Sequence, residues 1–210
     1  MSQELVQGSP EWIAARVGSV GASRISDIIA KTKTGYSTSR ANYAAELVAE
    51  RLTGAPAERF TNAAMAWGTE KEPDARAAYE FIHDVTVELV GIVKHPKIVG
   101  AHASPDGYIG DTGLIEIKCP LTATHIDTLL RGQVPDKYEV QMLWQMACTG
   151  RVWCDYVSFD PRLPPHLQLF VKRIHRNEPR IAELEQEVTL FLAEVESTIG
   201  KLAKLERKAA

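Results

Sequence analysis

Residues 104–118 constrain the fold of this chain more than any other stretch. They read Ser-Pro-Asp-Gly-Tyr-Ile-Gly-Asp-Thr-Gly-Leu-Ile-Glu-Ile-Lys. A turn-rich centre, from Gly107 to Gly113, lies between two apolar runs at residues 97–103 and 114–117. This pattern predicts two antiparallel strands joined by a hairpin whose tip lies near residues 111–113.

Side chains alternate along the second of these strands. Glu116 and Lys118 should therefore share one face, roughly 6.6 to 7 Å apart, while Ile115 and Ile117 point into a core. Asp106, near the end of the first strand, can come level with Glu116 across the ladder. Two carboxylates and one ammonium group are thus predicted to converge on one spot.

This convergence has a chemical interpretation. Carboxylate oxygens are hard ligands suited to Mg²⁺ or Mn²⁺, and Mg²⁺ commonly takes one or two protein carboxylates besides water and substrate phosphate. A nearby lysine can orient or help deprotonate an attacking water and offset charge on phosphate. Hydrolysis of a phosphodiester fits these groups. A half-exposed hairpin with an ordinary surface Glu–Lys pair fits the same spacing, and spacing alone leaves the two alternatives open.

Further residues resemble a known family. The Ser-Pro-Asp-Gly and Glu-Ile-Lys-Cys-Pro stretches resemble the PD-(D/E)xK nuclease core of the phage lambda exonuclease, or YqaJ-type viral recombinase, family. Three more motifs of that family occur in order: Arg16-Val17-Gly18 with Ala22-Ser23, Ala66-Trp67-Gly68 with Glu72, and Tyr138-Glu139-Val140-Gln141. The resemblance spans about residues 9–175.

The resemblance implies a mixed α/β (α+β) fold, with a central mixed β-sheet flanked by helices and a restriction-endonuclease-like core. It implies a metal-dependent exodeoxyribonuclease that degrades one strand of double-stranded DNA 5′ to 3′ from a 5′-phosphorylated end. The products would be mononucleotides and a 3′ overhang for recombination. It also implies two Mg²⁺ ions, with Mn²⁺ as an alternative, a homotrimeric ring and a single-strand annealing protein as partner.

Site residues follow from the same resemblance. The metal would be held by Asp106, Glu116 and the backbone carbonyl of Ile117. Lys118 would orient or help deprotonate the attacking water. Gln141 would complete the site and Tyr138 would support it.

The stretch 62–81 is rich in alanine and predicts helix, with a kink or a fresh helix start near Pro73. The resemblance makes Glu72 a further acidic residue of the metal site. Glu70 competes with it, but two helical positions separate the side chains by roughly 200°, so we expect only one to serve and favour Glu72. Met65 either wedges against the DNA end, as the resemblance suggests, or fills the core.

The N-terminal region predicts two helices, at residues 9–16 and 22–29, with Ser23 at or near the N-cap of the second. A helix N-terminus favours anions, so Ser23 and Arg16 could cradle a phosphate. Ordinary capping by Ser23 and pairing by Arg16 explain the same residues. The resemblance implies that both bind the 5′-phosphate of the degraded strand.

Other elements follow from periodicity and turn residues. Helices are predicted at residues 41–52, 122–130, 135–148 and about 178–205, and strands at 85–94, 152–159 and 167–174. His125 has no second His or Cys at ligand spacing and is predicted to lie on the surface. The loop cations Lys31, Lys33 and Arg40 are candidates for contact with a DNA backbone.

Composition fits one compact nuclease domain over residues 1–210, since 45% of residues are hydrophobic. No apolar stretch of about 18 residues occurs, and the first residues lack the form of a signal peptide, so we expect a cytoplasmic protein of a bacterial host, whether host- or phage-encoded, without membrane contact. The three cysteines are predicted to be reduced core thiols.

The net charge of −3 does not favour DNA binding through general positive charge. A metal site is itself acidic, however, and the 24 Lys and Arg residues can be concentrated locally. Two other functions stay open. One is a restriction or junction-cutting endonuclease on the same core, and the other is a non-catalytic DNA-binding module.

Overall fold

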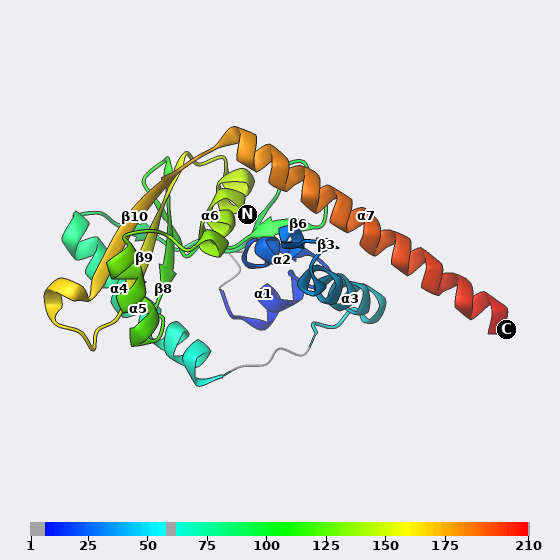
Figure 1. Cartoon of the computed structure of the whole chain (residues 1–210), viewed down its shortest axis with the longest axis horizontal. Coiled ribbons are helices and arrows are strands. Elements are labelled where there is room, and N and C mark those ends of the chain that lie inside the picture. Colours follow the sequence, from blue (N-terminus) through cyan, green and yellow to red (C-terminus); the bar gives the residue numbers. More distant parts are fainter. Residues whose placement is uncertain (1–6, 58–61, 210) are drawn as a thin grey trace. The chain divides into compact units, whose positions relative to one another are not determined.

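A computed structural model describes residues 7–57 and 62–209, with side chains described up to residue 205. The chain divides into two compact units. Figure 1 shows the elements of the chain in colours that follow the sequence. The first unit comprises residues 1–58, 91–104 and 177–210, and the second comprises residues 59–90 and 105–176. The single domain over residues 1–210 stays a prediction.

The first unit is mainly helical. A three-stranded sheet has the order β1-β6-β5, with β1 parallel and β5 antiparallel to β6. The elements of this unit are α1 (Pro10–Ala14), β1 (Val20–Gly21), the 3₁₀ helix η1 (Ala22–Arg24), α2 (Ile25–Ile29), β2 (Lys31–Thr32), β3 (Gly35–Tyr36), α3 (Thr38–Thr53), β5 (Val93–Lys94), β6 (Ala101–Ala103) and α7 (Glu178–Ala209). The long C-terminal helix is thus present and extends a few residues beyond its predicted end.

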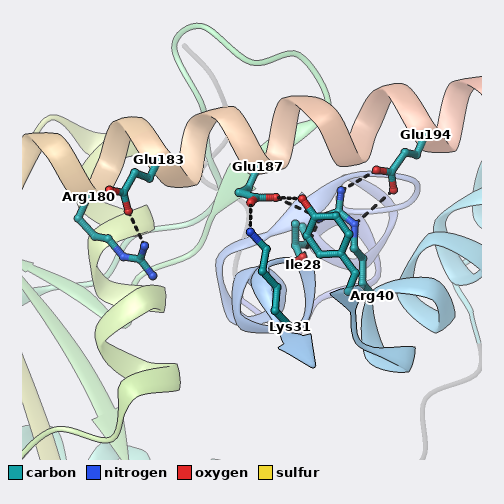
Figure 2. Close-up of polar contacts among 8 residues, drawn as sticks. Ile28, Lys31, Arg40, Arg180, Glu183, Glu187 and Glu194 are labelled. Carbon is teal, nitrogen blue, oxygen red and sulfur yellow. Dashed lines mark hydrogen bonds and ion pairs between the residues drawn. The ribbon is translucent and has the colours of Figure 1, made fainter. Parts of the chain in front are cut away.

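Helix α7 is held to the N-terminal segments by ion pairs (Figure 2). Arg40 is only 3% exposed and donates to Glu194 at 2.8 Å and to the Ile28 carbonyl at 2.7 Å. Glu187 accepts hydrogen bonds from Tyr36 at 2.6 Å and Lys31 at 3.0 Å. The hypothesis that Arg40 follows a DNA backbone is therefore wrong, because its guanidinium group is buried and used within the fold.

The second unit contains a five-stranded mixed sheet in the order β10-β9-β8-β7-β4. Strands β8 and β9 are parallel and the other neighbours are antiparallel. The elements are α4 (Ala63–His83), β4 (Val87–Glu88), β7 (Gly107–Ile109), β8 (Gly113–Lys118), α5 (Thr122–Arg131), α6 (Asp136–Thr149), β9 (Trp153–Phe159), the 3₁₀ helix η2 (Pro165–Leu167) and β10 (Leu169–His175). This is the mixed sheet with flanking helices that the sequence predicts.

The two faces of this sheet differ in chemistry. One face forms an apolar core in which Ala75 and Tyr79 of α4 pack with Ile115, Ile117 and Val157. The other face meets α5 and α6 and contains polar groups, because alternation along β8 turns Glu116 and Lys118 away from the apolar core. The sheet therefore separates a structural face from a polar one.

His125 of α5 corrects a prediction. It is fully buried, with Nδ1 2.7 Å from the Ser158 hydroxyl and Nε2 donating to the Leu167 carbonyl at 2.8 Å. The expected surface position is wrong because both ring nitrogens find partners on neighbouring segments, which spacing in the sequence does not reveal. Cys119, Cys148 and Cys154 are buried and free, as expected.

Two element boundaries also differ from expectation. The first strand of the hairpin is β7, whereas the apolar run at 97–103 contributes only β6, in the other unit. The stretch 85–94 forms two short strands in different sheets, not one strand. Helix α4 continues through Pro73, so of the two predicted alternatives the fresh start is wrong and the kink stays a prediction; proline cannot donate one backbone hydrogen bond there. Among the described helices none has the length and apolar character needed to cross a membrane.

Candidate active site

The β7–β8 hairpin sets two carboxylates opposite each other. Its antiparallel register pairs Gly107 with Ile115, so Asp106, one residue before β7, is level with Glu116. The backbone N–H of Ile117 donates to Asp106 Oδ2 at 2.6 Å. This bond fixes the Asp106 side chain against the strand that bears Glu116, as the sequence predicts.

Glu116 is fully buried in the middle of a central strand. A buried carboxylate needs hydrogen bonds or a cation, since its water is lost. Lys118 forms an ion pair with Oε1 of Glu116, so the two side chains share a face as predicted. Gln141 Nε2 donates to the same oxygen at 2.6 Å.

Electrostatics distinguish these groups from ordinary surface residues. Burial, followed by the neighbouring charge of Glu116, raises the pKa of Asp106 well above its ordinary value. Burial alone would lower the pKa of Lys118, but the charges of Glu116 and Asp106 and the hydrogen bond to Glu116 raise it above its ordinary value. Lys118 is therefore a permanent cation at neutral pH in the metal-free protein.

Glu72 of α4 interacts with the same cluster, whereas Glu70 does not. The pKa of Glu72 is raised above its ordinary value, chiefly by burial. The charges of Arg76 and Lys118 act in the opposite direction, and the charge of Glu116 adds to the rise. Glu70 is 67% exposed and pairs with Lys71 at 3.0 Å. The geometry thus agrees with the choice of Glu72, whose role in the site stays a prediction.

Helix α6 lines the polar face of β8. Tyr138 stacks on Tyr156 with ring centroids 5.6 Å apart, and the Lys118 ammonium lies 5.3 Å from the Tyr138 ring. A residue absent from the predicted site, Gln145, also reaches Glu116: its Nε2 donates to Oε2 at 2.5 Å. The signal for it was available, because Gln145 is four residues from Gln141 and therefore on the same helical face.

The candidate phosphate-binding residues belong to the first unit. The Arg16 guanidinium stacks 3.9 Å from the Trp12 ring centroid, and Ser9 caps α1 by accepting the Trp12 N–H at 3.1 Å. Ser23 is exposed but lies inside η1, whose N-cap is Gly21. Ser23 is therefore not itself an N-cap, but it lies near one, next to Arg24 at the N-cap of α2, and its role in phosphate binding stays a prediction.

Residues 11–152 match the model of the YqaJ-like viral recombinase domain. This chain belongs to that family. The alkaline exonuclease LHK-Exo of Laribacter hongkongensis is 51% identical, with a TM-score of 0.89 over 96% of this chain and 100% of that one. LHK-Exo in complex with dAMP is equally identical, at 51%, with a TM-score of 0.90 over the same shares of both chains.

A phage-related exonuclease of Haemophilus somnus 129PT is 16% identical, with a TM-score of 0.69 over 88% of this chain and 96% of that one. At this identity the likeness concerns the fold alone. No curated protein sequence matches the chain.

The donor set of this YqaJ-family site suits a hard divalent cation. Among the described residues no group of three or more His, Cys, Asp or Glu side chains is arranged to hold a metal ion. Mg²⁺, however, often takes only one or two carboxylates and completes its shell with water, carbonyls and substrate. Asp106 and Glu116 bring two carboxylates against the single ammonium of Lys118, and burial, followed by the charge of Glu116, raises the pKa of Asp106. A divalent cation would offset the charge of these carboxylates.

Proposed function

We propose that this protein is a Mg²⁺-dependent 5′-to-3′ exonuclease of double-stranded DNA. It would start at a 5′-phosphorylated end, release mononucleotides and leave a 3′ overhang for recombination by single-strand annealing. The observation that carries the proposal is the convergence of Asp106, Glu116 and Lys118 on the β7–β8 hairpin. The exonuclease activity in the name of LHK-Exo, and its complex with a mononucleotide, support it.

In this proposal Asp106, Glu116 and the Ile117 carbonyl would hold the metal, with Glu72 as a further acidic group. Bound Mg²⁺, as one or two ions, would polarise the scissile phosphate and lower the pKa of the attacking water. Mn²⁺ has similar ligand preferences and could replace it.

Lys118 would orient the attacking water and offset charge on the phosphate. Its raised pKa favours this electrostatic role over that of a neutral base. Gln141 would hold the Glu116 carboxylate through the 2.6 Å hydrogen bond, and Tyr138 would limit the movement of Lys118 from one side. Glu116, a proposed metal ligand, would thus be held by the uncharged Gln141 as well as by Lys118.

Arg16 and Ser23 would bind the terminal 5′-phosphate. The planar guanidinium group of Arg16 suits a phosphate, and stacking on Trp12 restricts its orientation. The exposed hydroxyl of Ser23 can donate one hydrogen bond. The proposed assembly is a homotrimeric ring around DNA, acting with a single-strand annealing protein in the bacterial cytoplasm; family membership supports these points.

The test offers four protein samples to three DNA substrates in Mg²⁺. The substrates are a linear duplex with 5′-phosphate ends, the same duplex with 5′-hydroxyl ends, and a covalently closed circle. The samples are wild type, Lys118→Met, Arg16→Met and the control Lys172→Met, an exposed lysine of β10 in the same unit as Lys118.

The proposal expects mononucleotide release from the phosphorylated linear duplex, loss of release in Lys118→Met and wild-type activity in Lys172→Met. Arg16→Met should remove the preference for the 5′-phosphate. Cutting of the closed circle would identify an endonuclease and overturn both the exonuclease and the roles of Arg16 and Ser23. DNA binding without any metal-dependent cleavage by the wild type would identify a non-catalytic module.

A further inference from the structure

Two amides on one face of α6 hold both oxygens of the same buried carboxylate. Gln141 donates to Glu116 Oε1 at 2.6 Å and Gln145 donates to Oε2 at 2.5 Å. Gln145 has no exposed surface, so it meets neither solvent nor an incoming substrate. Its polar group must therefore act within the protein.

Burial makes this contact consequential. Residues 140–148 of α6 are all buried, and in such a helix a glutamine needs partners for both ends of its amide. The Gln145 Nε2 finds Glu116, and its Oε1 accepts from the Cys154 thiol at 3.9 Å. The thiol can donate to the oxygen end of the amide, which keeps the N–H₂ end turned toward Glu116. Strand β9 thereby orients Gln145.

The two hydrogen bonds together restrict rotation of the Glu116 carboxylate. A donor on one oxygen alone leaves the carboxylate free to rotate about its Cγ–Cδ bond. Donors on both oxygens fix the plane of the group, and with it the directions of the lone pairs that remain. A metal ligand held in this way loses less entropy on binding than a free one.

We propose that Gln145 is a positioning residue that fixes the plane of the Glu116 carboxylate for the metal ion. The inference rests on the proposed metal-dependent function. Outer hydrogen bonds to metal ligands typically change metal affinity or activity 10- to 100-fold, and we expect an effect in that range. Gln145 makes no contact with DNA in this proposal, so DNA affinity should not change.

The experiment compares wild type with Gln145→Met, which keeps the length of the side chain but removes its N–H donor. Gln186→Met is the matched control, because Gln186 is exposed on α7 in the other unit. Mn²⁺ binding is measured by calorimetry without DNA, and duplex affinity by fluorescence anisotropy in Ca²⁺. The kcat and KM for a 5′-phosphorylated duplex are measured over a series of Mg²⁺ concentrations.

We expect about 10- to 100-fold weaker Mn²⁺ binding and a lower kcat for Gln145→Met, with partial recovery at high Mg²⁺ and unchanged DNA affinity and KM. Wild-type Mn²⁺ affinity in a folded Gln145→Met protein would overturn the inference, as would a rise in KM that accounts for the whole loss. If Gln145→Met does not fold, Mn²⁺ binding is measured on Cys154→Ala instead, because this substitution removes the thiol that orients the Gln145 amide. Weaker Mn²⁺ binding supports the inference and wild-type binding refutes it.

The wild-type sample separates the two levels of argument. If the wild type releases nucleotides in a metal-dependent way and Gln145→Met has the same Mn²⁺ affinity and kcat, the positioning role of Gln145 is refuted and the proposed function stands. Absence of any metal-dependent cleavage by the wild type would refute the proposed function itself.

Discussion

Replacement of Asp106 by asparagine should make the metal-free protein more stable while it removes activity. The substitution is nearly isosteric, and the amide oxygen can still accept the Ile117 N–H that now lies 2.6 Å from Oδ2. The substitution removes the cost, in wild type, of either ionising a buried carboxyl beside Glu116 or keeping a proton on it, with Glu72 a further source of repulsion. Lys118 is the cation that offsets it, and Lys118 already pairs with Glu116.

The size of the effect follows from burial. The effective penalty for burying one ion is several kcal/mol, and the Ile117 N–H together with Lys118 offsets part of it, so we expect a net gain of about 1 to 3 kcal/mol. In a protein of this size each kcal/mol corresponds to about 2 to 4 °C in Tm. The Asp106→Asn protein should therefore melt roughly 2 to 12 °C above wild type in the presence of EDTA.

The pH dependence has a definite sign. Because folding raises the pKa of Asp106, the folded metal-free protein keeps a proton that the unfolded chain has lost. The contribution of Asp106 to stability is fully present below the unfolded pKa of about 4 and is lost as pH rises through the raised pKa of the folded state. Asp106→Asn removes this contribution, so the Tm advantage of the variant should grow with pH.

Scanning calorimetry in EDTA and in excess Mg²⁺ tests this account. Metal binding stabilises the folded state by about 2.7 kcal/mol at a hundredfold excess over Kd, so Mg²⁺ should raise the Tm of wild type and leave Asp106→Asn unchanged. A variant less stable than wild type in EDTA at pH 8 would refute the reasoning about buried repulsion. An equal Mg²⁺ shift in both proteins would refute the role of Asp106 as a ligand.

Three further outcomes are expected. A Cβ at Gly113 would lie 2.2 Å from the Trp153 ring, so Gly113→Ala should cost about 1 to 3 kcal/mol in urea unfolding, and a wild-type midpoint would contradict the packing argument. Arg40→Met removes a buried cation from its partly exposed acidic partners on α7 and should cost about 1.5 to 3 kcal/mol, measured as a lower Tm. An unchanged Tm would show that the pairs contribute nothing. Burial alone would raise the pKa of Asp160, but hydrogen bonds from Arg162 and Thr122 lower it to about 2. Asp160→Asn should therefore be about 1 to 2 kcal/mol less stable than wild type at neutral pH. Acid unfolding curves should show this difference vanish as pH falls from 4 toward 2.

Local rules were sufficient to predict the centre of the site. Alternation along β8 determines that Glu116 and Lys118 share a face, and the turn length determines that Asp106 is opposite Glu116. Both rules act over a few residues and need no knowledge of the remaining chain. The register of the hairpin was therefore predictable, although its first strand was assigned to residues 97–103 and is β7, and the mixed sheet followed from the family resemblance.

Predictions that depended on distant partners were less successful. The apolar run at 97–103 suits a strand in either sheet, and only its pairing with β1 and β5 assigns β6 to the first unit. The surface position of His125 was inferred from the absence of nearby ligands, whereas Ser158 and Leu167 bury it from a distance. Gln145 was left out of the predicted site although it lies one helical turn from Gln141, because spacing alone does not show that its amide reaches Glu116.

The charges of the site explain why its residues come from separate elements. Glu72 is paired with Arg76 at 3.8 Å, which leaves the Asp106 and Glu116 carboxylates against the single ammonium of Lys118. Uncharged donors on α6 and on the β8 backbone stabilise these carboxylates without adding the second cation that would cancel their charge. With Asp106 ionised, one buried negative charge would be uncompensated, and the raised pKa of Asp106 favours a proton there in the metal-free protein. A divalent ion that replaces this proton would offset the same charge. Because binding of that ion and folding favour the same state, the loss of any one of these donors should weaken both.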